Sequence, residues 1–169
     1  NIHAGHNPDD KSACGAIGLI KESTENRNVK DDLIDILKDK NNTVYDCTVN
    51  NGTSVSDVIN KIVAKCNAHS VDLDVSIHFN SGAEDKNGNG KSTGVEVLVY
   101  KMSGTAYEAA VRICKEIEAL GYKNRGVKQR TDLGVLKKTK APALLVECCF
   151  VDDKDDIDLY NSKSIAKAI

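Results

Sequence analysis

The segment "ALLVE", Ala143–Glu147, constrains the fold of this chain most strongly. It follows Pro142, and its apolar residues are continuous, which is typical of a β-strand that is buried on both faces of a sheet. Further strand-like segments lie at Asn1–His3, Asn42–Cys47, Val71–Phe79, Val95–Tyr100 and Gly126–Arg130. A strand that needs cover on both faces predicts a layer of helices on each side of the sheet.

Helical apolar patterns alternate with these strands. The first helix is expected from about Thr24 to Lys38, with apolar residues recurring along one face. The second opens at Ser54, where Asp57 three residues later approximates a capping box. The remaining helical segments are expected at Thr105–Leu120, Leu133–Lys138, Asp152–Tyr160 and Ser162–Ile169. This alternation predicts a single α/β domain over residues 1–169 with a mostly parallel sheet.

Composition and charge exclude several classes of protein. The formal net charge is −2, and the basic residues are scattered among few aromatics, which argues against nucleic-acid binding. No apolar run approaches the roughly 18 residues of a membrane span, and no signal-peptide pattern is seen. The six cysteines form no Cys-x-x-Cys motif, so we expect them to be reduced. The sequence therefore predicts synthesis in the cytoplasm and no action on membranes or nucleic acids.

Residues capable of metal binding or acid–base chemistry stand where predicted strands end. They are His3 and His6 after the first strand, His78 in "SIHFN", Glu147 after "LLV", and Glu22 and Glu25 at the start of the first helix. Functional groups gather at the carboxyl ends of parallel strands, so these side chains can meet. Two imidazoles and one carboxylate form the ligand set of many catalytic zinc sites. The residues alone leave open which early histidine and which helix-start glutamate would take part.

Each candidate also has a structural interpretation. A histidine at a strand end commonly makes loop hydrogen bonds, and a glutamate in a first helical turn favours the helix dipole. Glu147 is harder to explain in this way, because an ionised carboxylate in a buried strand costs on the order of several kcal/mol unless it is paired or in a site. Asn80 lies two residues past His78, and we expect it to face the same site as a substrate contact.

Five segments, in order along the chain, carry a family resemblance. They are Gly5-His6, "ESTEN" at Glu22–Asn26, "SIHFNS" at Ser76–Ser81, "KNRGVK" at Lys123–Lys128 and "LKKTKAPALLVECCF" at Leu136–Phe150. With them the chain resembles the zinc-dependent N-acetylmuramoyl-L-alanine amidases of the type 3 family, in the form used by clostridial phage endolysins. It departs from the family at Asn7, where glycine is common, and at Cys149, which replaces the glycine of a Glu-x-Gly-Phe motif.

The resemblance implies a site and a fold. It carries the zinc ligands onto His6, Glu22 and His78, with one Zn²⁺ per chain, and the catalytic glutamate onto Glu147. The glutamate four residues before Asn26 is the family's ligand, which selects Glu22. The implied fold is a twisted, mixed six-stranded sheet, mostly parallel and flanked by helices on both faces.

The resemblance also implies a function. The expected reaction is cleavage of the amide between N-acetylmuramic acid and the L-alanine of the stem peptide, as in autolysins and endolysins that lyse bacterial cell walls. The expected partner is peptidoglycan, and the expected form is a monomeric catalytic domain with a C-terminal cell-wall-binding domain outside this chain. Two alternatives remain open: a zinc peptidase acting on wall peptides, with Arg125 or Arg130 holding a terminal carboxylate, and a non-catalytic wall-binding module.

Overall fold

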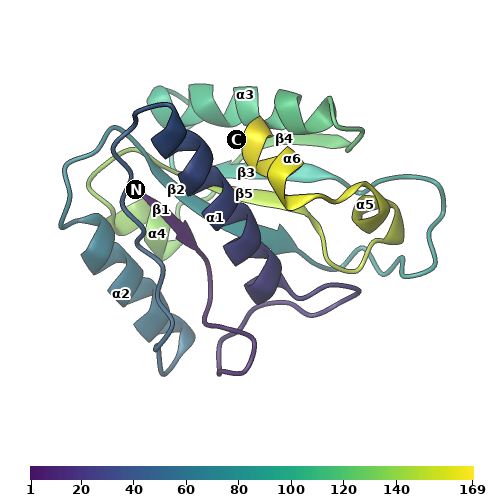
Figure 1. Cartoon of the computed structure of the whole chain (residues 1–169), viewed down its shortest axis with the longest axis horizontal. Coiled ribbons are helices and arrows are strands. Elements are labelled where there is room, and N and C mark those ends of the chain that lie inside the picture. The colour runs from purple at the N-terminus through teal and green to yellow at the C-terminus, as the bar shows by residue number, and fades with distance from the viewer.

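A five-stranded mixed sheet forms the centre of the protein, whose computed structural model describes all 169 residues. Its strands are β1 (Ile2–Ala4), β2 (Asp74–Asn80), β3 (Val95–Val99), β4 (Asn124–Gln129) and β5 (Ala143–Phe150), in the spatial order β1-β2-β5-β3-β4. Strands β1, β2 and β5 are parallel, whereas β3 is antiparallel to β5 and parallel to β4 (Figure 1). The predicted α/β fold with a mostly parallel, mixed sheet is confirmed.

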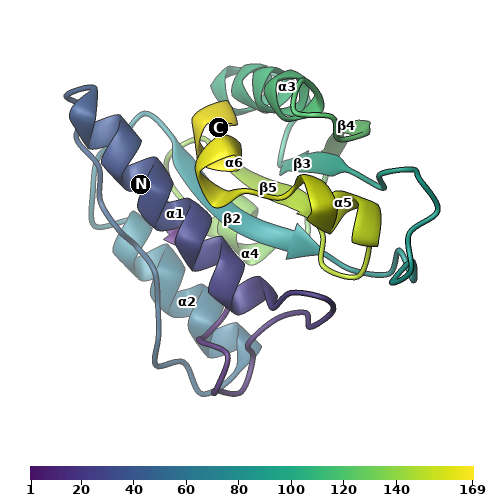
Figure 2. The same ribbon diagram turned by 45° about the vertical axis from the view of Figure 1, so that its right-hand side comes forward.

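Helices cover both faces of this sheet. They are α1 (Glu22–Asp39), α2 (Val55–Cys66), α3 (Thr105–Glu118), α4 (Gly134–Lys138), α5 (Lys154–Leu159) and α6 (Ser162–Ala168). Helices α1, α3 and α6 pack on one face, while α2 and α4 pack together on the other (Figures 1 and 2). No helix combines the length and the apolar character that crossing a membrane requires.

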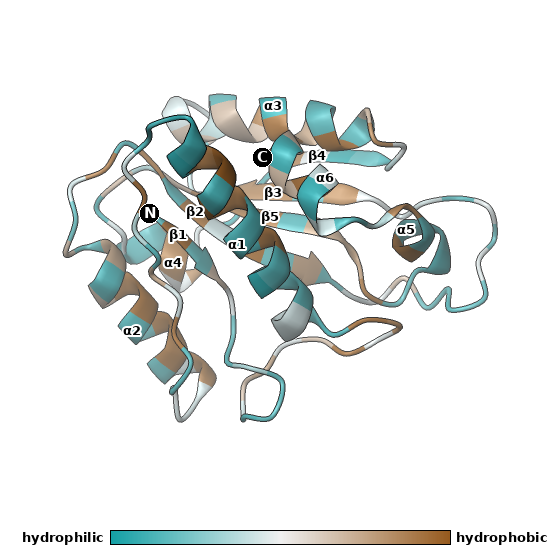
Figure 3. Ribbon diagram, viewed as in Figure 1, coloured by the Kyte–Doolittle hydropathy of each residue, from teal (hydrophilic) through white to brown (hydrophobic).

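The two faces of the sheet bury two separate apolar clusters. The larger, with 23 buried residues, lies under α1, α3 and α6, and the smaller, with 11, lies under α2 and α4. Along β5, Leu144 and Val146 belong to the larger cluster and Leu145 to the smaller. The continuous apolar run of β5 is therefore explained by burial on both faces. Hydrophobic and hydrophilic residues alternate along the helices, as expected for amphipathic helices between core and solvent (Figure 3).

The expected number of six strands is wrong by one. The segment Asn42–Cys47 pairs with β1 only through a single bridge between Ile2 and Asp46, with hydrogen bonds from Ile2 N to Tyr45 O and from Cys47 N to Ile2 O. The carboxylate of Asp46 then accepts from Thr48 N at 2.9 Å. Beyond this point Ala4 N donates to the side chain of Thr48, at 3.1 Å from Oγ1, and not to a backbone carbonyl, so the strand pairing does not continue.

The topology places three strand ends beside one helix start. Because β1, β2 and β5 are parallel, their carboxyl ends lie at the same edge of the sheet, and α1 begins at that edge with Glu22. On the face that carries α2 and α4, Leu145 and Leu98 lie in the smaller cluster. One step further toward this edge, His78, Glu147 and Glu96 form a row of cross-strand partners that belongs to neither apolar cluster.

The capping of α2 gives a test of this local structure. Ser54 accepts a hydrogen bond from Asp57 N through its side chain, and Asp57 accepts one from Thr53 N. We expect Ser54→Ala to lower the free energy of unfolding by about 1 kcal/mol, because the first turn of α2 loses its cap. Ser56→Ala, in the exposed first turn of the same helix, is the control and should change it little. Equal losses in urea unfolding of the two variants would contradict the capping role.

Candidate active site

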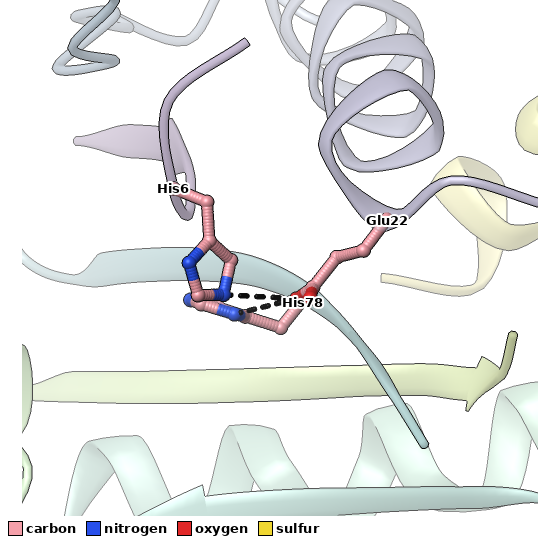
Figure 4. A group of neighbouring side chains, drawn as sticks. All are labelled: His6, Glu22 and His78. Atoms are coloured by element: carbon pink, nitrogen blue, oxygen red, sulfur yellow. Dashed lines mark hydrogen bonds and ion pairs between the residues drawn. The ribbon is translucent and has the colours of Figure 1, made fainter. Parts of the chain in front are cut away.

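Three side chains from distant parts of the sequence converge at the sheet edge. His6 follows β1, Glu22 is the first residue of α1, and His78 lies in β2. Their potential ligand atoms all lie within 4.8 Å of one another. Glu22 Oε1 is 3.3 Å from His6 Nε2 and 2.9 Å from His78 Nδ1, and all three side chains point toward a common centre (Figure 4). We call this group the His-Glu-His cluster.

Glu22 is the centre of this cluster. The residue is 3% exposed, and its carboxylate accepts from two backbone amides, Phe79 N at 3.2 Å and Ala16 N at 2.7 Å. It is also hydrogen-bonded to His78 Nδ1 and in ion-pair contact with His6 Nε2. Burial opposes its ionisation, but the hydrogen bonds and charges of His6 and His78 outweigh burial and hold the pKa of Glu22 well below its ordinary value. Glu22 is therefore an ionised acceptor at the edge of the sheet.

The backbone around His6 is held from α1. His6 has a φ of +65°, in the left-handed region that residues other than glycine rarely adopt. Asn26 Nδ2 donates to Gly5 O at 2.8 Å, and Arg27 Nη2 donates to His6 O at 3.0 Å. A Cβ on Gly5 would lie 2.0 Å from His78 Cε1, so the position needs glycine for the imidazole to pass. These contacts fix where the His6 ring can lie.

The donor set fits a zinc ion. The rings of His6 and His78 lie 4.8 Å apart between centroids at 78°, so they approach Glu22 from different directions. Burial lowers the pKa of His78, although Glu22 opposes this, which favours the neutral imidazole that a metal requires. Two imidazoles and a carboxylate, held by further hydrogen bonds, are the three protein ligands of a common class of catalytic zinc site.

Glu147 stands directly beside this cluster. It is the cross-strand partner of His78 on one side and of Glu96 on the other, so the three side chains share one face of the sheet. Its Oε2 atom is buried and has no hydrogen-bond partner. Burial, reinforced by the charges of Glu22 and Glu96, raises the pKa of Glu147 to about 8, and Arg130 opposes the shift. An unpartnered, readily protonated carboxyl thus faces the same space as the cluster.

The structure separates the alternatives that the sequence left open. His3 is buried within β1, where its Nδ1 lies 3.4 Å from Ser76 Oγ, and it stays outside the cluster. Burial, with the charge of His78, lowers the pKa of His3 to about 3. Glu25 accepts from Asn28 Nδ2 and Tyr160 Oη instead. His6 and Glu22 are the members that join His78.

Asn80 and Glu96 lie further along the same face. Asn80 Nδ2 donates to Glu96 Oε1 at 3.2 Å, and Asn80 Oδ1 accepts from Ser81 N, beyond an irregularity in the pairing of β2. Contact of Asn80 with substrate stays a prediction. Glu96 was not among the residues predicted from the sequence, although it is an acidic residue inside the apolar strand "VEVLV", the same signal that singled out Glu147.

An apolar cavity of about 210 Å³ adjoins the cluster. It opens beside His6 and His78 and is walled by side chains of α2, the segment that leads into α4, α4 and β5, among them Val55, Ile59, Leu133, Val135 and Leu145. This wall keeps one side of the cluster apolar, which strengthens electrostatic interactions there.

A second acidic group lies in the loop after β2 and at the start of α5. Carboxylate oxygens of Asp85, Asp153 and Asp155 lie within 4.8 Å of one another. Asp155 accepts from the backbone amides of residues 89–91, and Asp153 caps α5 and accepts from Thr93 N. These bonds anchor the loop, and the group contains no imidazole.

Comparison with known proteins places the chain in a family. The family model described as N-acetylmuramoyl-L-alanine amidase matches residues 1–169, and the chain belongs to this family, as its sequence motifs indicated. An uncharacterised 38.4 kDa protein of Clostridium perfringens is 36% identical over 163 residues, covering 96% of this chain and 46% of that protein. The endolysin of Bacillus phage SPP1 is 34% identical over 172 residues, covering 96% and 58%. The chain thus spans about half the length of these curated relatives.

Solved structures of related domains have the same fold. The catalytic domain of an endolysin targeting Clostridia difficile superposes with a TM-score of 0.85 at 28% identity, covering 99% of this chain and 91% of that one. An N-acetylmuramoyl-L-alanine amidase from Clostridium difficile, at 23% identity and a TM-score of 0.72, covers 99% and 91% and supports the fold. The chain therefore belongs to the N-acetylmuramoyl-L-alanine amidase family and shares the fold of these domains.

The raised pKa of Glu147 predicts a pH effect on stability. In metal-free protein the folded state holds this proton up to about pH 8, whereas the unfolded chain releases it near the ordinary value of 4.5. Between these values the unfolded state binds fewer protons, so the unfolding free energy falls as pH rises. Glu147→Gln removes this contribution. In denaturant titrations without metal, wild type should lose stability relative to Glu147→Gln from pH 4.5 to 8, and parallel curves would contradict the assignment.

Proposed function

We propose that this protein hydrolyses the amide between the lactyl group of N-acetylmuramic acid and the L-alanine of the stem peptide. One observation carries the proposal: the buried, unpartnered carboxyl of Glu147 adjoins the His-Glu-His cluster at the carboxyl ends of parallel strands. Membership of the amidase family and likeness to an endolysin catalytic domain support it.

The ligands of the proposed zinc ion are His6, Glu22 and His78, with one ion per chain. When bound by three protein ligands, Zn²⁺ lowers the pKa of a water molecule to roughly 7 and polarises a carbonyl group. The remaining groups of the chain support this set. Phe79 N and Ala16 N orient the Glu22 carboxylate, while Asn26 and Arg27 fix the backbone that carries His6.

Glu147 serves as general base and then as general acid. It takes a proton from the water whose oxygen attacks the amide carbonyl carbon, and it delivers that proton to the alanine nitrogen as the C–N bond breaks. The products are a free lactyl carboxylate and a free L-alanine amino terminus. A carboxyl with a raised pKa suits this task, because it can both accept and release a proton near neutral pH.

The contacts do not favour either alternative over the amidase. Arg130 is paired with Asp132 through Nε and Nη2. Arg125 bonds Glu96 through Nε and keeps its Nη groups free, so it can hold a peptide carboxylate in an amidase or in a peptidase and does not distinguish the two. A non-catalytic binding module has no need of a buried Glu147 beside the cluster. End-group analysis of digested wall distinguishes the reactions, since an amidase frees L-alanine amino termini.

The proposed setting is the bacterial cell wall. We infer that the domain is made in the cytoplasm and acts as a monomer on peptidoglycan. Curated relatives about twice as long as the matched region are consistent with a separate wall-binding domain, which we place C-terminal to this chain.

Removing the acid–base group tests the reaction. Glu147→Gln keeps the shape of the side chain but cannot accept the proton, so we expect the release of L-alanine amino termini from purified walls to fall by about 10²-fold or more. Circular dichroism and zinc content should match wild type. Glu116→Gln, at an exposed position of α3, is the matched control and should be fully active. Substantial activity of Glu147→Gln would refute this role.

Removing a ligand tests the metal site. We expect His78→Ala to lose tightly bound zinc together with activity, because only two protein ligands remain. His69→Ala is the control, since His69 stacks on Tyr45 outside the cluster. Zinc is measured by elemental analysis after dialysis, and folding by thermal melting of both variants. A full equivalent of zinc in folded His78→Ala would count against ligation.

A further inference from the structure

Two cations share one carboxylate beside Glu147. Glu96 Oε2 accepts from Arg125 Nε at 2.8 Å and also from Lys128 Nζ, while Oε1 accepts from Asn80. Glu96 is 8% exposed, whereas the side chains of Arg125 and Lys128 are 29% and 44% exposed, so a buried carboxylate holds two partly exposed cations. One carboxylate neutralises only one of the two cations, which leaves a surplus positive charge on the β3–β4 side of Glu147.

Most hydrogen-bond donors of Arg125 have no partner within the protein. Only Nε of Arg125 donates to the protein, so the four N–H groups on Nη1 and Nη2 have no protein acceptor. Its guanidinium carbon lies 5.0 Å from the centroid of the Phe150 ring, and its side chain is 29% exposed. Glu96 and Phe150 thus fix a planar fork of donors, and such a fork matches the two oxygens of a carboxylate.

The neighbouring basic residue differs. Arg130 donates through both Nε and Nη2 to the carboxylate of Asp132. The charge of Arg130 is therefore balanced by Asp132, whereas the surplus positive charge of Arg125 and Lys128 beside Glu96 has no balancing carboxylate. On this side of the site, Arg125 is the arginine whose Nη1 and Nη2 groups are held in place without a protein acceptor.

We propose that Arg125 binds a carboxylate of the peptide portion of the substrate, one or two residues beyond the alanine that is released. This inference rests on the proposed amidase function. In the strand order β5-β3-β4, Arg125 lies two strands from Glu147, or roughly 10 Å at the usual strand spacing. An extended peptide covers about 3.3–3.6 Å per residue, so a carboxylate in the second or third residue reaches this distance.

The predicted specificity is for stem peptides whose carboxyl groups are free. Conversion of that carboxylate to an amide removes the charge and leaves an N–H donor facing the donors of Arg125. Loss of a charge-assisted hydrogen bond typically corresponds to about tenfold or more in rate or binding. Arg125 is thus a specificity-determining residue, separate from the cluster and from Glu147.

One purified wall preparation, divided in two, tests the proposal. One half is left untreated, and the peptide carboxyls of the other are converted to amides with a carbodiimide and ammonia. The readout is the rate at which L-alanine amino termini appear. Wild type should cleave the amidated wall about tenfold or more slowly, whereas Arg125→Gln should cleave both walls at one low rate.

Two further variants make the outcome decisive. Arg125→Lys keeps the charge without the planar fork and should restore part of the preference. Arg112→Gln removes an exposed arginine on α3, across the sheet, and should keep the wild-type ratio. A structural defect lowers the cleavage rates of both walls equally. The ratio of the two rates within each variant therefore reports recognition of the carboxylate alone.

Equal cleavage of the two walls by wild type, or an unchanged ratio in Arg125→Gln, would overturn the proposal. Failure of wild type to release alanine from untreated wall would instead refute the amidase function on which it rests.

Discussion

The buried carboxylate of Glu22 joins the parts of the site. It belongs to the first residue of α1, accepts hydrogen bonds from His78, Ala16 N and Phe79 N, and forms an ion-pair contact with His6. Those groups belong to the loops after β1 and to β2, so one anion connects two strands and a helix start. Without it, two imidazoles and two backbone amides would be left at the sheet edge without an acceptor.

Three glutamates in one site are set to different tasks by their neighbours. Burial opposes ionisation of Glu22 and Glu96, but hydrogen bonds from two histidines and from Lys128 and Arg125 respectively keep both pKa values low. Glu147 lies in the same row with a buried oxygen that has no partner, and its pKa is raised. When the surroundings of neighbouring carboxyl groups push their pKa values apart in this way, one group stays an ionised acceptor and another can carry a proton.

Much of this arrangement was predictable from the sequence. The apolar run of β5 and the alternation of strands and helices predicted the fold class, and strand-end positions predicted which side chains could meet. The family resemblance selected His6 and Glu22, and the geometry brings the same two together with His78.

Other features needed the structure. The sixth strand is absent because Thr48 meets Ala4 N through its side chain and not through the backbone, an effect that apolar patterning does not reveal. Glu96 was missed because its partners Arg125 and Lys128 come from β4, 29 and 32 residues away. Pairing across a sheet depends on strand order, and the placement of β3 between β5 and β4 cannot be deduced from spacing along the chain.

The proposed zinc site is tested most directly by a crystal structure of the protein as purified, with anomalous diffraction recorded at the zinc edge. We expect one anomalous peak among His6, Glu22 and His78, with ligand distances of about 2.0–2.2 Å, and with Glu147 beside it but not ligating. Absence of a peak there, or zinc only at Asp85, Asp153 and Asp155, would contradict it.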